Sequence, residues 1–203
     1  MQCKVCNQTI NEFNFNDFFG IKKHVLCYKC FNELSLINEV TTIENFKCFS
    51  IYLYKDKIKD LIYQFKVLKD YELKDVFLEY FLEELNYKYR KYIITFVPSY
   101  HLDDTNRGFN HVEAMFSSLK NKKICLFKKT INHKQSDQKL YNRTKIKDYI
   151  YLDKSKLRGI KKVLIVDDIL TTGNTLKSCA KLLTNEGIKD IQLLTICKAS
   201  NYK

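Results

Sequence analysis

Two adjacent aspartates and a threonine-rich turn carry the clearest chemistry in the sequence. They stand in VLIVDDILTTGNT, residues 163–175, where four apolar residues lead into Asp167 and Asp168 and threonines then surround Gly173. In an open α/β sheet, ligands bind beyond the carboxyl ends of the strands. The N-terminus of the following helix offers unpaired N–H groups and a positive dipole to a phosphate, whereas carboxylates only accept hydrogen bonds and suit hydroxyls or a metal. The pattern therefore predicts a ligand with a phosphate and a vicinal diol, such as a ribose 5-phosphate.

This stretch does not match three common motifs that stand at the start of a helix. A helix N-cap needs one Asp, Ser or Thr, not two acids and three threonines around a glycine. A Walker A loop would end in Gly-Lys-Ser or Gly-Lys-Thr, and a dinucleotide-binding loop would read G-x-G-x-x-G. Neither of these two loop motifs occurs in the chain.

A second pattern with chemical meaning lies near the start of the chain. Cys3 and Cys6 form one C-x2-C pair, and Cys27 and Cys30 form another. The spacer, residues 7–26, has the length of the zinc template, in which about 15–20 residues separate the pairs. Four thiolates complete a tetrahedral site without an open position, so we expect a structural Zn²⁺. The alternatives are two unrelated pairs of reduced thiols or a redox-active C-x2-C.

Length and charge limit the possible classes of protein. The 203 residues fit one main domain with a small appendage, and we expect a zinc-binding segment over residues 1–45 and a main domain over residues 46–203. The net charge of +12 fits nucleic acid, an anionic membrane surface or a phosphorylated substrate, although scattered lysines can also serve solubility alone. The sequence contains no apolar run of 18 residues and no signal-peptide h-region, so a cytoplasmic protein is expected.

Apolar periodicity predicts the elements that position these residues. The pattern turns helical from about residue 50 to residue 92, with apolar positions at helical spacing in two runs. Short β-branched and aromatic runs indicate strands, and their alternation with helices indicates an α/β fold with a mainly parallel sheet. The predicted helices cover residues 56–65, 76–81 and 174–185, and a further helix follows the polar loop at Arg107-Gly108. The predicted strands cover residues 92–100, which run into a loop at Pro98, and residues 122–129, 161–166 and 190–197.

The stretch VLIVDDILTTGNT resembles the phosphoribosyl-pyrophosphate (PRPP) motif of type I phosphoribosyltransferases. The resemblance implies the fold of that family, a parallel sheet flanked by helices, and contacts from Asp167 and Asp168 to the ribose hydroxyls. Mg²⁺ accompanies PRPP in that family and bridges the diol and the pyrophosphate oxygens. The loop implied to bind the 5′-phosphate consists of Thr171, Thr172, Gly173, Asn174 and Thr175.

Four further motifs narrow the resemblance to the ComF family of competence proteins, in particular its ComFC-like members. They are CKVC…CYKC, FVPSY, NRGFNHVEAM and HKQSDQKLYNR, and with the PRPP motif they span nearly the whole chain. The resemblance implies a role in uptake of single-stranded DNA during natural transformation, beside a ComFA-like helicase, in the cytoplasm and at the inner face of the membrane. The alternative is a metabolic phosphoribosyltransferase that transfers phosphoribose from PRPP to a base or an amine.

Phosphoribosyl transfer displaces pyrophosphate from the anomeric carbon, and the chain offers candidates for holding that group. Arg107 lies beside a glycine in a polar loop after a predicted strand, and a guanidinium binds phosphate bidentately. Lys66 is the second candidate cation, and Ser99 and Tyr100 offer backbone N–H groups. The alternative for Arg107 and Lys66 is that both are surface charges.

No residue is marked by the sequence as a general base for an acceptor. His101, His111 and His133 are available, but such histidines are more often surface or capping residues. The sequence therefore leaves open whether the chain is an enzyme. The residues expected to carry a transfer are Asp167, Asp168 and Arg107.

Overall fold

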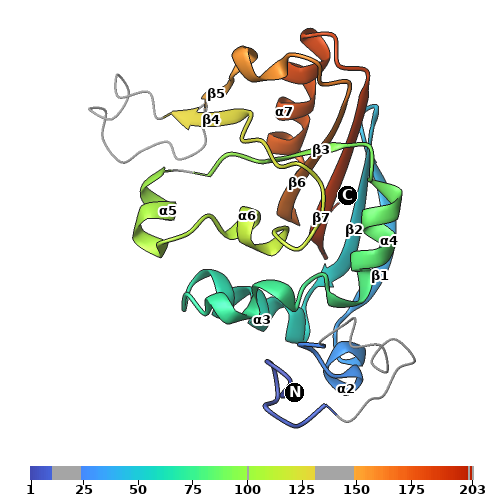
Figure 1. Ribbon diagram of the computed structural model, residues 1–203, viewed down its shortest axis with the longest axis vertical. Coiled ribbons are helices and arrows are strands. Elements are labelled where there is room, and N and C mark those ends of the chain that lie inside the picture. Colours follow the sequence, from blue (N-terminus) through green and yellow to red (C-terminus); the bar gives the residue numbers. More distant parts are fainter. Residues whose placement is uncertain (11–23, 100, 131–148, 201, 203) are drawn as a thin grey trace.

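The computed structural model describes residues 1–10, 24–99, 101–130, 149–200 and 202 (Figure 1). Tyr100, His133 and the motif HKQSDQKLYNR lie outside these residues, so the predictions made for them stay predictions. The longest described helix has 12 residues. Within the described residues, no helix is both long enough and apolar enough to cross a membrane.

A five-stranded sheet forms the centre of the molecule. Four neighbouring strands, β2, β7, β6 and β3, run parallel, and β1 pairs antiparallel with β2 at one edge. The mainly parallel sheet predicted from the sequence is therefore confirmed. In sheet order, the strands are β1 (Leu36–Ile43), β2 (Phe46–Tyr54), β7 (Asp190–Ala199), β6 (Lys162–Leu170) and β3 (Ile93–Phe96).

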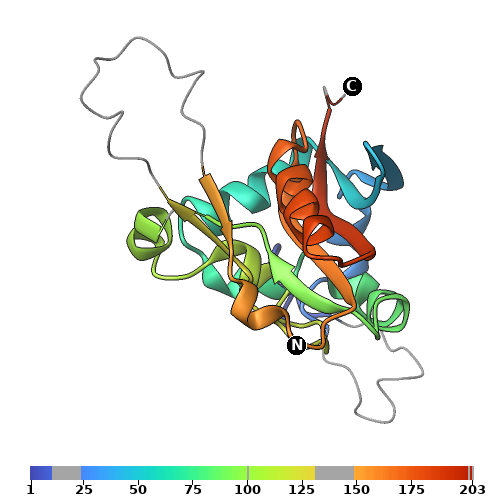
Figure 2. The same cartoon turned by 90° about the horizontal axis from the view of Figure 1, so that it is seen from above.

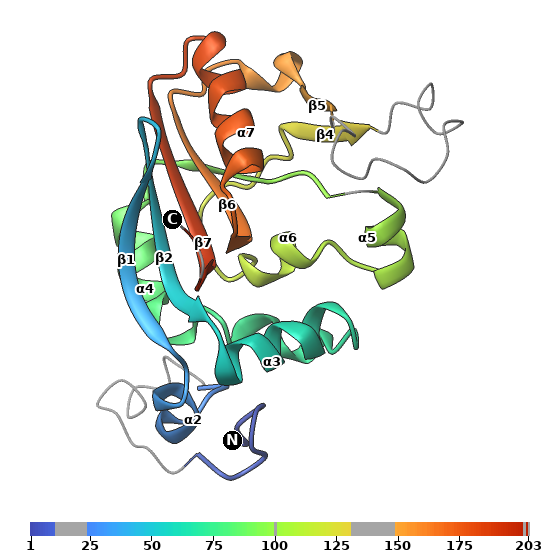
Figure 3. The ribbon, with the colours of Figure 1, turned by 180° about the vertical axis from the view of Figure 1, so that it is seen from behind.

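Helices cover both faces of this sheet, which explains the unbroken apolar run at residues 163–166 of β6. Val163 and Ile165 belong to the same buried cluster as the apolar face of α7 (Asn174–Asn185). Leu164 and Val166 belong to a second buried cluster, which includes residues of three other helices. These helices are α3 (Asp56–Lys66), α4 (Leu82–Lys88) and α6 (His111–Met115). Figures 1 and 3 show α7 on one side of the sheet and α4 on the other.

The N-terminal segment that contains Cys3, Cys6, Cys27 and Cys30 lies at one end of the molecule, next to α3 (Figures 1 and 3). Its helix α2 (Tyr28–Asn32) begins within the second cysteine pair, and Cys3, Leu26 and Cys30 are buried in the same cluster as the apolar face of α3. The segment therefore packs on the main domain through a shared core. Strand β1, which falls within residues 1–45, is already part of the main sheet.

Residues 36–54 form a hairpin that the periodicity did not predict. The helical pattern expected from about residue 50 was wrong for residues 50–54, which complete β2. This strand is buried on both faces, and periodicity alone cannot distinguish such a run from a helix. The buried hydroxyl of Ser50 forms a hydrogen bond with Thr195 Oγ1 of β7, with the two oxygens 2.8 Å apart. Pairing with the neighbouring strand therefore decides the extended conformation of residues 50–54.

The second predicted helix, residues 76–81, was placed too early, because the α-helix in this region begins only at Leu82. Two short 3-10 helices, η1 (Tyr71–Asp75) and η2 (Glu79–Phe81), precede α4 there. Val76 and Phe77 lie between them and are fully buried. The apolar residues reach the core from successive turns instead of from one helical face.

A small two-stranded sheet lies apart from the main sheet, as the view from above shows (Figure 2). It pairs β4 (Phe127–Thr130) with β5 (Tyr149–Leu152), and η4 (Lys154–Leu157) follows. The predicted strand 122–129 was therefore too long at its start, where Lys123 makes only an isolated bridge to Ile94 of β3. The pairing of β4 with β5 brings Lys129 toward the site described below.

Candidate ribose-phosphate site and four-cysteine cluster

The two aspartates lie within β6 instead of after it. β6 continues to Leu170 because it stays paired with β7, with Asp167 opposite Thr195. The expectation that the strand ends at Val166 was therefore wrong. Backbone pairing with a neighbour, and not the polarity of the side chains, decides where a strand ends.

Asp168 is a buried carboxylate held from three directions. Its Oδ2 accepts from Lys66 Nζ at 2.6 Å and lies 3.1 Å from His111 Nε2, and its Oδ1 accepts from Ile169 N–H at 2.7 Å. Burial alone would raise the pKa of Asp168, but the hydrogen bond with His111 and the charge of Lys66 outweigh burial and lower the pKa below its usual range. The carboxylate is therefore charged at neutral pH.

Asp167 is the less constrained of the two carboxyl groups. Its Oδ1 accepts from Asp168 N–H at 2.9 Å, and no hydrogen bond from the described residues reaches its Oδ2. Burial, followed by the charge of Asp168, raises the pKa of Asp167 well above its usual range. The two neighbours thus differ in character, because Asp168 is fixed and charged whereas Asp167 offers an open oxygen.

Arg107 is the last residue of helix α5 (His101–Arg107), not a loop residue as expected. Gly108 follows with φ 86°, a left-handed conformation that favours glycine after a helix. The Arg107 side chain is only 11% exposed. It donates from Nε to Lys66 O at 3.0 Å and from Nη1 to Asp104 Oδ1 at 3.3 Å. The Arg107 side chain is therefore largely buried and held by hydrogen bonds, and it is not the surface charge that the alternative interpretation expected.

A capping residue fixes the start of α6 against this group. Asn110 precedes His111, and its Oδ1 accepts from Glu113 N–H at 2.9 Å, as an N-cap does. The Asn110 amide also donates to Ser99 Oγ at 3.1 Å and to Asp104 Oδ2 at 2.9 Å. The motif NRGFNHVEAM thereby joins the end of α5, the start of α6 and the segment after β3.

These groups surround a cavity of about 190 Å³. Five of the predicted site residues line it, together with two ionisable residues that the sequence analysis did not select, His111 and Lys129. His111 was considered only as an available histidine, and no pattern around Lys129 marks it. The lining residues are Lys66, Val97, Pro98, Ser99, Arg107, His111, Val112, Lys129, Asp167 and Asp168.

The predicted phosphate loop connects β6 to α7. Helix α7 begins at Asn174, as predicted, and Gly173 precedes it with φ 70° and without a side-chain cap. Thr171, Thr172 and Asn174 are exposed. The loop residues are not among those that line the cavity. The N-terminus of a 12-residue helix suits an anion, but the role of this loop stays a prediction.

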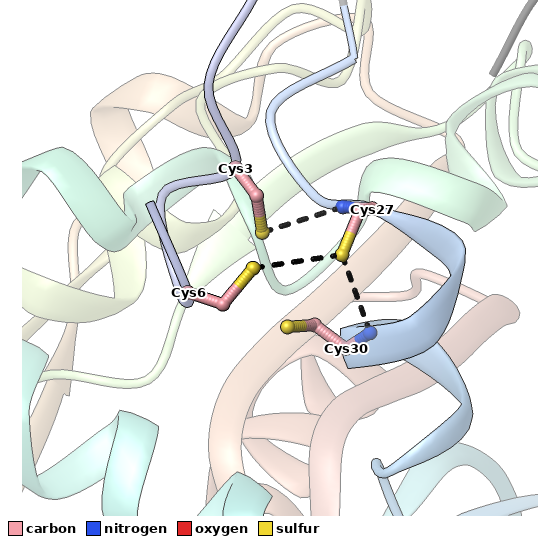
Figure 4. Close-up of side chains that lie close together, drawn as sticks. All are labelled: Cys3, Cys6, Cys27 and Cys30. Atoms are coloured by element: carbon pink, nitrogen blue, oxygen red, sulfur yellow. Dashed lines mark hydrogen bonds between the residues drawn. The ribbon is translucent and has the colours of Figure 1, made fainter. Parts of the chain in front are cut away.

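The four predicted cysteine ligands come together in space (Figure 4). Their Sγ atoms all lie within 4.8 Å of one another. The Sγ atoms of Cys6 and Cys27 are 3.8 Å apart, and the thiol sulfurs of Cys3 and Cys27 accept N–H groups from Cys27 and Cys30. A tetrahedral zinc with Zn–S bonds of about 2.3 Å would set its sulfurs about 3.8 Å apart. The arrangement therefore fits a four-thiolate metal ion.

Comparisons with known proteins decide the family. Residues 105–203 match the family model of the phosphoribosyl transferase domain. The chain is 31% identical over 151 residues to Competence protein ComFC of Streptococcus pneumoniae, a match that covers 73% of this chain and 67% of that protein. The chain belongs to the ComF family.

This ComF-family chain has further similarities to known proteins. It is 26% identical over 140 residues to Competence protein ComFC of Bacillus subtilis, across 68% of this chain and 58% of that protein. Among solved structures, it is similar to a hypoxanthine phosphoribosyltransferase from Staphylococcus aureus, with 17% identity and a TM-score of 0.43 across 66% of this chain and 67% of that one. The resemblance seen in the motifs, and the fold class it implied, are confirmed.

Proposed function

We propose that this ComF-family chain binds PRPP with Mg²⁺ in the cavity at the end of β6. The observation that carries the proposal is the composition of the cavity, in which two adjacent carboxyl groups face three cations. Carboxyl oxygens accept hydrogen bonds from a ribose diol, and the cations Lys66, Arg107 and Lys129 attract pyrophosphate. PRPP carries both groups on one sugar.

In this proposal, different residues bind the ribose hydroxyls, the Mg²⁺ ion and the phosphate groups of PRPP. Asp167, with its open Oδ2, and Asp168, which keeps one free acceptor position, receive the ribose hydroxyls. Mg²⁺ is held in proteins by one or two carboxylates together with phosphate oxygens, so the donor set at Asp167 fits it. When bound, the ion offsets negative charge on the pyrophosphate. Arg107 and Lys66 hold the pyrophosphate in place, and the loop after β6 binds the 5′-phosphate.

We further propose that Cys3, Cys6, Cys27 and Cys30 bind one structural Zn²⁺. The distances between their sulfurs support this, as does the burial of three of the four residues. Four thiolates leave no position for a substrate, so the ion stabilises the fold of the segment. This segment is short, and it shares its core with α3.

The role proposed for this binding site is uptake of single-stranded DNA during natural transformation. Support comes from the names of the two relatives, both competence proteins, and from the net charge of +12, which suits a polyanion. A DNA-uptake helicase at the inner face of the membrane is the proposed partner. Binding of single-stranded DNA should weaken steeply with salt, because each phosphate contact releases a counterion.

A thermal-shift titration tests the PRPP site. At a PRPP concentration of about 100 times Kd, with Mg²⁺ present, the chain should gain about 2.7 kcal/mol, which raises the melting temperature by several degrees. The double variant Asp167→Ala, Asp168→Ala should lose this gain. Asp190→Ala is the matched control, because Asp190 lies opposite Lys162 at the far end of the same strand pair. An unchanged melting temperature of the parent chain at saturating PRPP would reject the site.

The second candidate function is a metabolic phosphoribosyltransferase. The intact sequence DDILTTG and the match to the phosphoribosyl transferase domain favour it. Release of pyrophosphate from PRPP only in the presence of a defined base or amine would support this function. Salt-dependent binding of single-stranded DNA without such release would support the competence role.

A further inference from the structure

The hydrogen bonds of His111 identify which of its nitrogens carries a proton. Nδ1 of His111 lies 2.9 Å from Nη1 of Arg107, and Nε2 lies 3.1 Å from Asp168 Oδ2. A guanidinium has only donors, so Nδ1 must be the acceptor of the first contact. A carboxylate has only acceptors, so Nε2–H must be the donor of the second. His111 is therefore a neutral imidazole with its proton on Nε2.

This imidazole and Lys66 hold the same oxygen of Asp168 from two sides. The side chains of His111 and Asp168 are 8% and 10% exposed, whereas that of Lys66 is 34% exposed. His111 is thus the more enclosed of the two partners. With Ile169 N–H on Oδ1, three of the roughly four acceptor positions of the carboxylate are filled. The position that remains, on Oδ1, is available to a ligand hydroxyl.

Arg107 forms hydrogen bonds with both residues that contact Asp168 Oδ2, His111 and Lys66. It donates to the Nδ1 of His111, which fixes the proton on Nε2, and to the backbone oxygen of Lys66, which fixes the end of α3. Within the described residues, Nη2 of Arg107 makes no hydrogen bond, so it can reach a phosphate without breaking these contacts.

We propose that His111 is a positioning residue of the ribose-phosphate site: held in its Nε2–H form by Arg107, it orients the Asp168 carboxylate that receives a ribose hydroxyl. This inference rests on the proposed function and adds a residue to it. Glutamine can take both roles, since its amide has an N–H donor and an oxygen acceptor. Leucine fills similar space and can take neither.

Isothermal titration with two probes separates a positioning role from a merely structural one. The probes are ribose 5-phosphate, which has the diol, and inorganic pyrophosphate, which does not. His111→Leu should bind ribose 5-phosphate about tenfold or more weakly, because it loses a hydrogen bond to a charged group. His111→Gln should stay within about threefold of the parent chain, and pyrophosphate affinity should change less than about threefold in either variant.

Three results would overturn the inference alone while the parent chain still binds. They are unchanged ribose 5-phosphate affinity in His111→Leu, an equal loss in His111→Gln, and an equal loss of both probes in His111→Leu. A parent chain that binds neither ribose 5-phosphate nor PRPP would overturn the proposed function together with this inference.

A spectroscopic measurement needs no variant of His111 to fold. In the parent chain with ¹⁵N-labelled histidine, His111 should show an unprotonated Nδ1 and a protonated Nε2. Arg107→Met removes the donor to Nδ1, so the proton distribution of His111 should change. A protonated Nδ1 in the parent chain, or an identical spectrum in Arg107→Met, would contradict the role of Arg107.

Discussion

The ammonium group of Lys66 lies 2.6 Å from Asp168 Oδ2, although the two residues are 102 positions apart in the sequence. The contact joins the last residue of α3 to the part of β6 that lines the cavity. A lysine at a helix C-terminus is favoured by the helix dipole, but here its charge is directed at a buried carboxylate. The packing of α3 on the sheet therefore sets the electrostatics of the site.

Lys66→Met should destabilise the protein by about 1–2 kcal/mol at pH 7, because the buried Asp168 loses a charged partner while Lys66 itself is partly solvated. The lowered pKa of Asp168 contributes stability above the unfolded value of about 3.9, and this contribution is lost as the pH falls through the folded pKa. Urea unfolding should show the difference shrinking below about pH 3.9. Lys162→Met is the control, because Lys162 pairs with the more exposed Asp190. An equal loss in both variants would contradict the prediction.

Asp167→Asn should stabilise the protein at neutral pH and weaken ribose 5-phosphate binding. The pKa of Asp167 is raised in the folded state, so the parent chain loses stability as the pH rises from about 3.9 through that pKa. Asparagine cannot ionise, so the stability advantage of the variant should grow as the pH rises from about 3.9 toward the raised pKa of Asp167. Asp168→Asn should behave in the opposite way, since its pKa is lowered. Thermal melts at several pH values would contradict the prediction if Asp167→Asn melts lower than the parent at the alkaline end.

Gly173→Ala should destabilise the protein more than Gly187→Ala. Both glycines have positive φ, 70° and 83°, so each substitution costs about 1–2 kcal/mol from the backbone alone. A Cβ at Gly173 would also lie 3.0 Å from Ile43 Cδ1, whereas one at Gly187 meets nothing within 4 Å. Only Gly173→Ala should also weaken PRPP binding, as measured by titration. Equal effects of the two substitutions on PRPP affinity would contradict the role of Gly173 in binding the 5′-phosphate.

Cys30→Ser should abolish zinc binding and lower the melting temperature. Cys30 is 2% exposed and shares a buried cluster with α3, so loss of the metal should loosen this end of the core. Elemental analysis of the parent chain should find one zinc per chain. Cys125→Ser is the matched control, because Cys125 is exposed and lies outside the cluster. A parent chain that is folded without zinc would reject the site.

Some predictions succeeded because their signals are local. The C-x2-C pairs place two sulfurs on one short turn wherever the chain runs, and the helix at Asn174–Asn185 follows from its own apolar face. Strand β2 of the hairpin at residues 36–54 was missed because a strand buried on both faces has no distinctive period. The end of β6 was misplaced because pairing with β7 extends the strand through the aspartates.

By itself, the sequence determined the pair of aspartates, the turn that leads into a helix and the four cysteines, since each depends on neighbours a few residues away. Only the tertiary structure decided that Asp168 is fixed and charged while Asp167 stays open, because Lys66, His111 and Arg107 reach the site from separate helices. It also brought Lys129 to the cavity from the small sheet. Contacts between distant elements depend on how helices pack on the sheet, and no local pattern in the sequence records that packing.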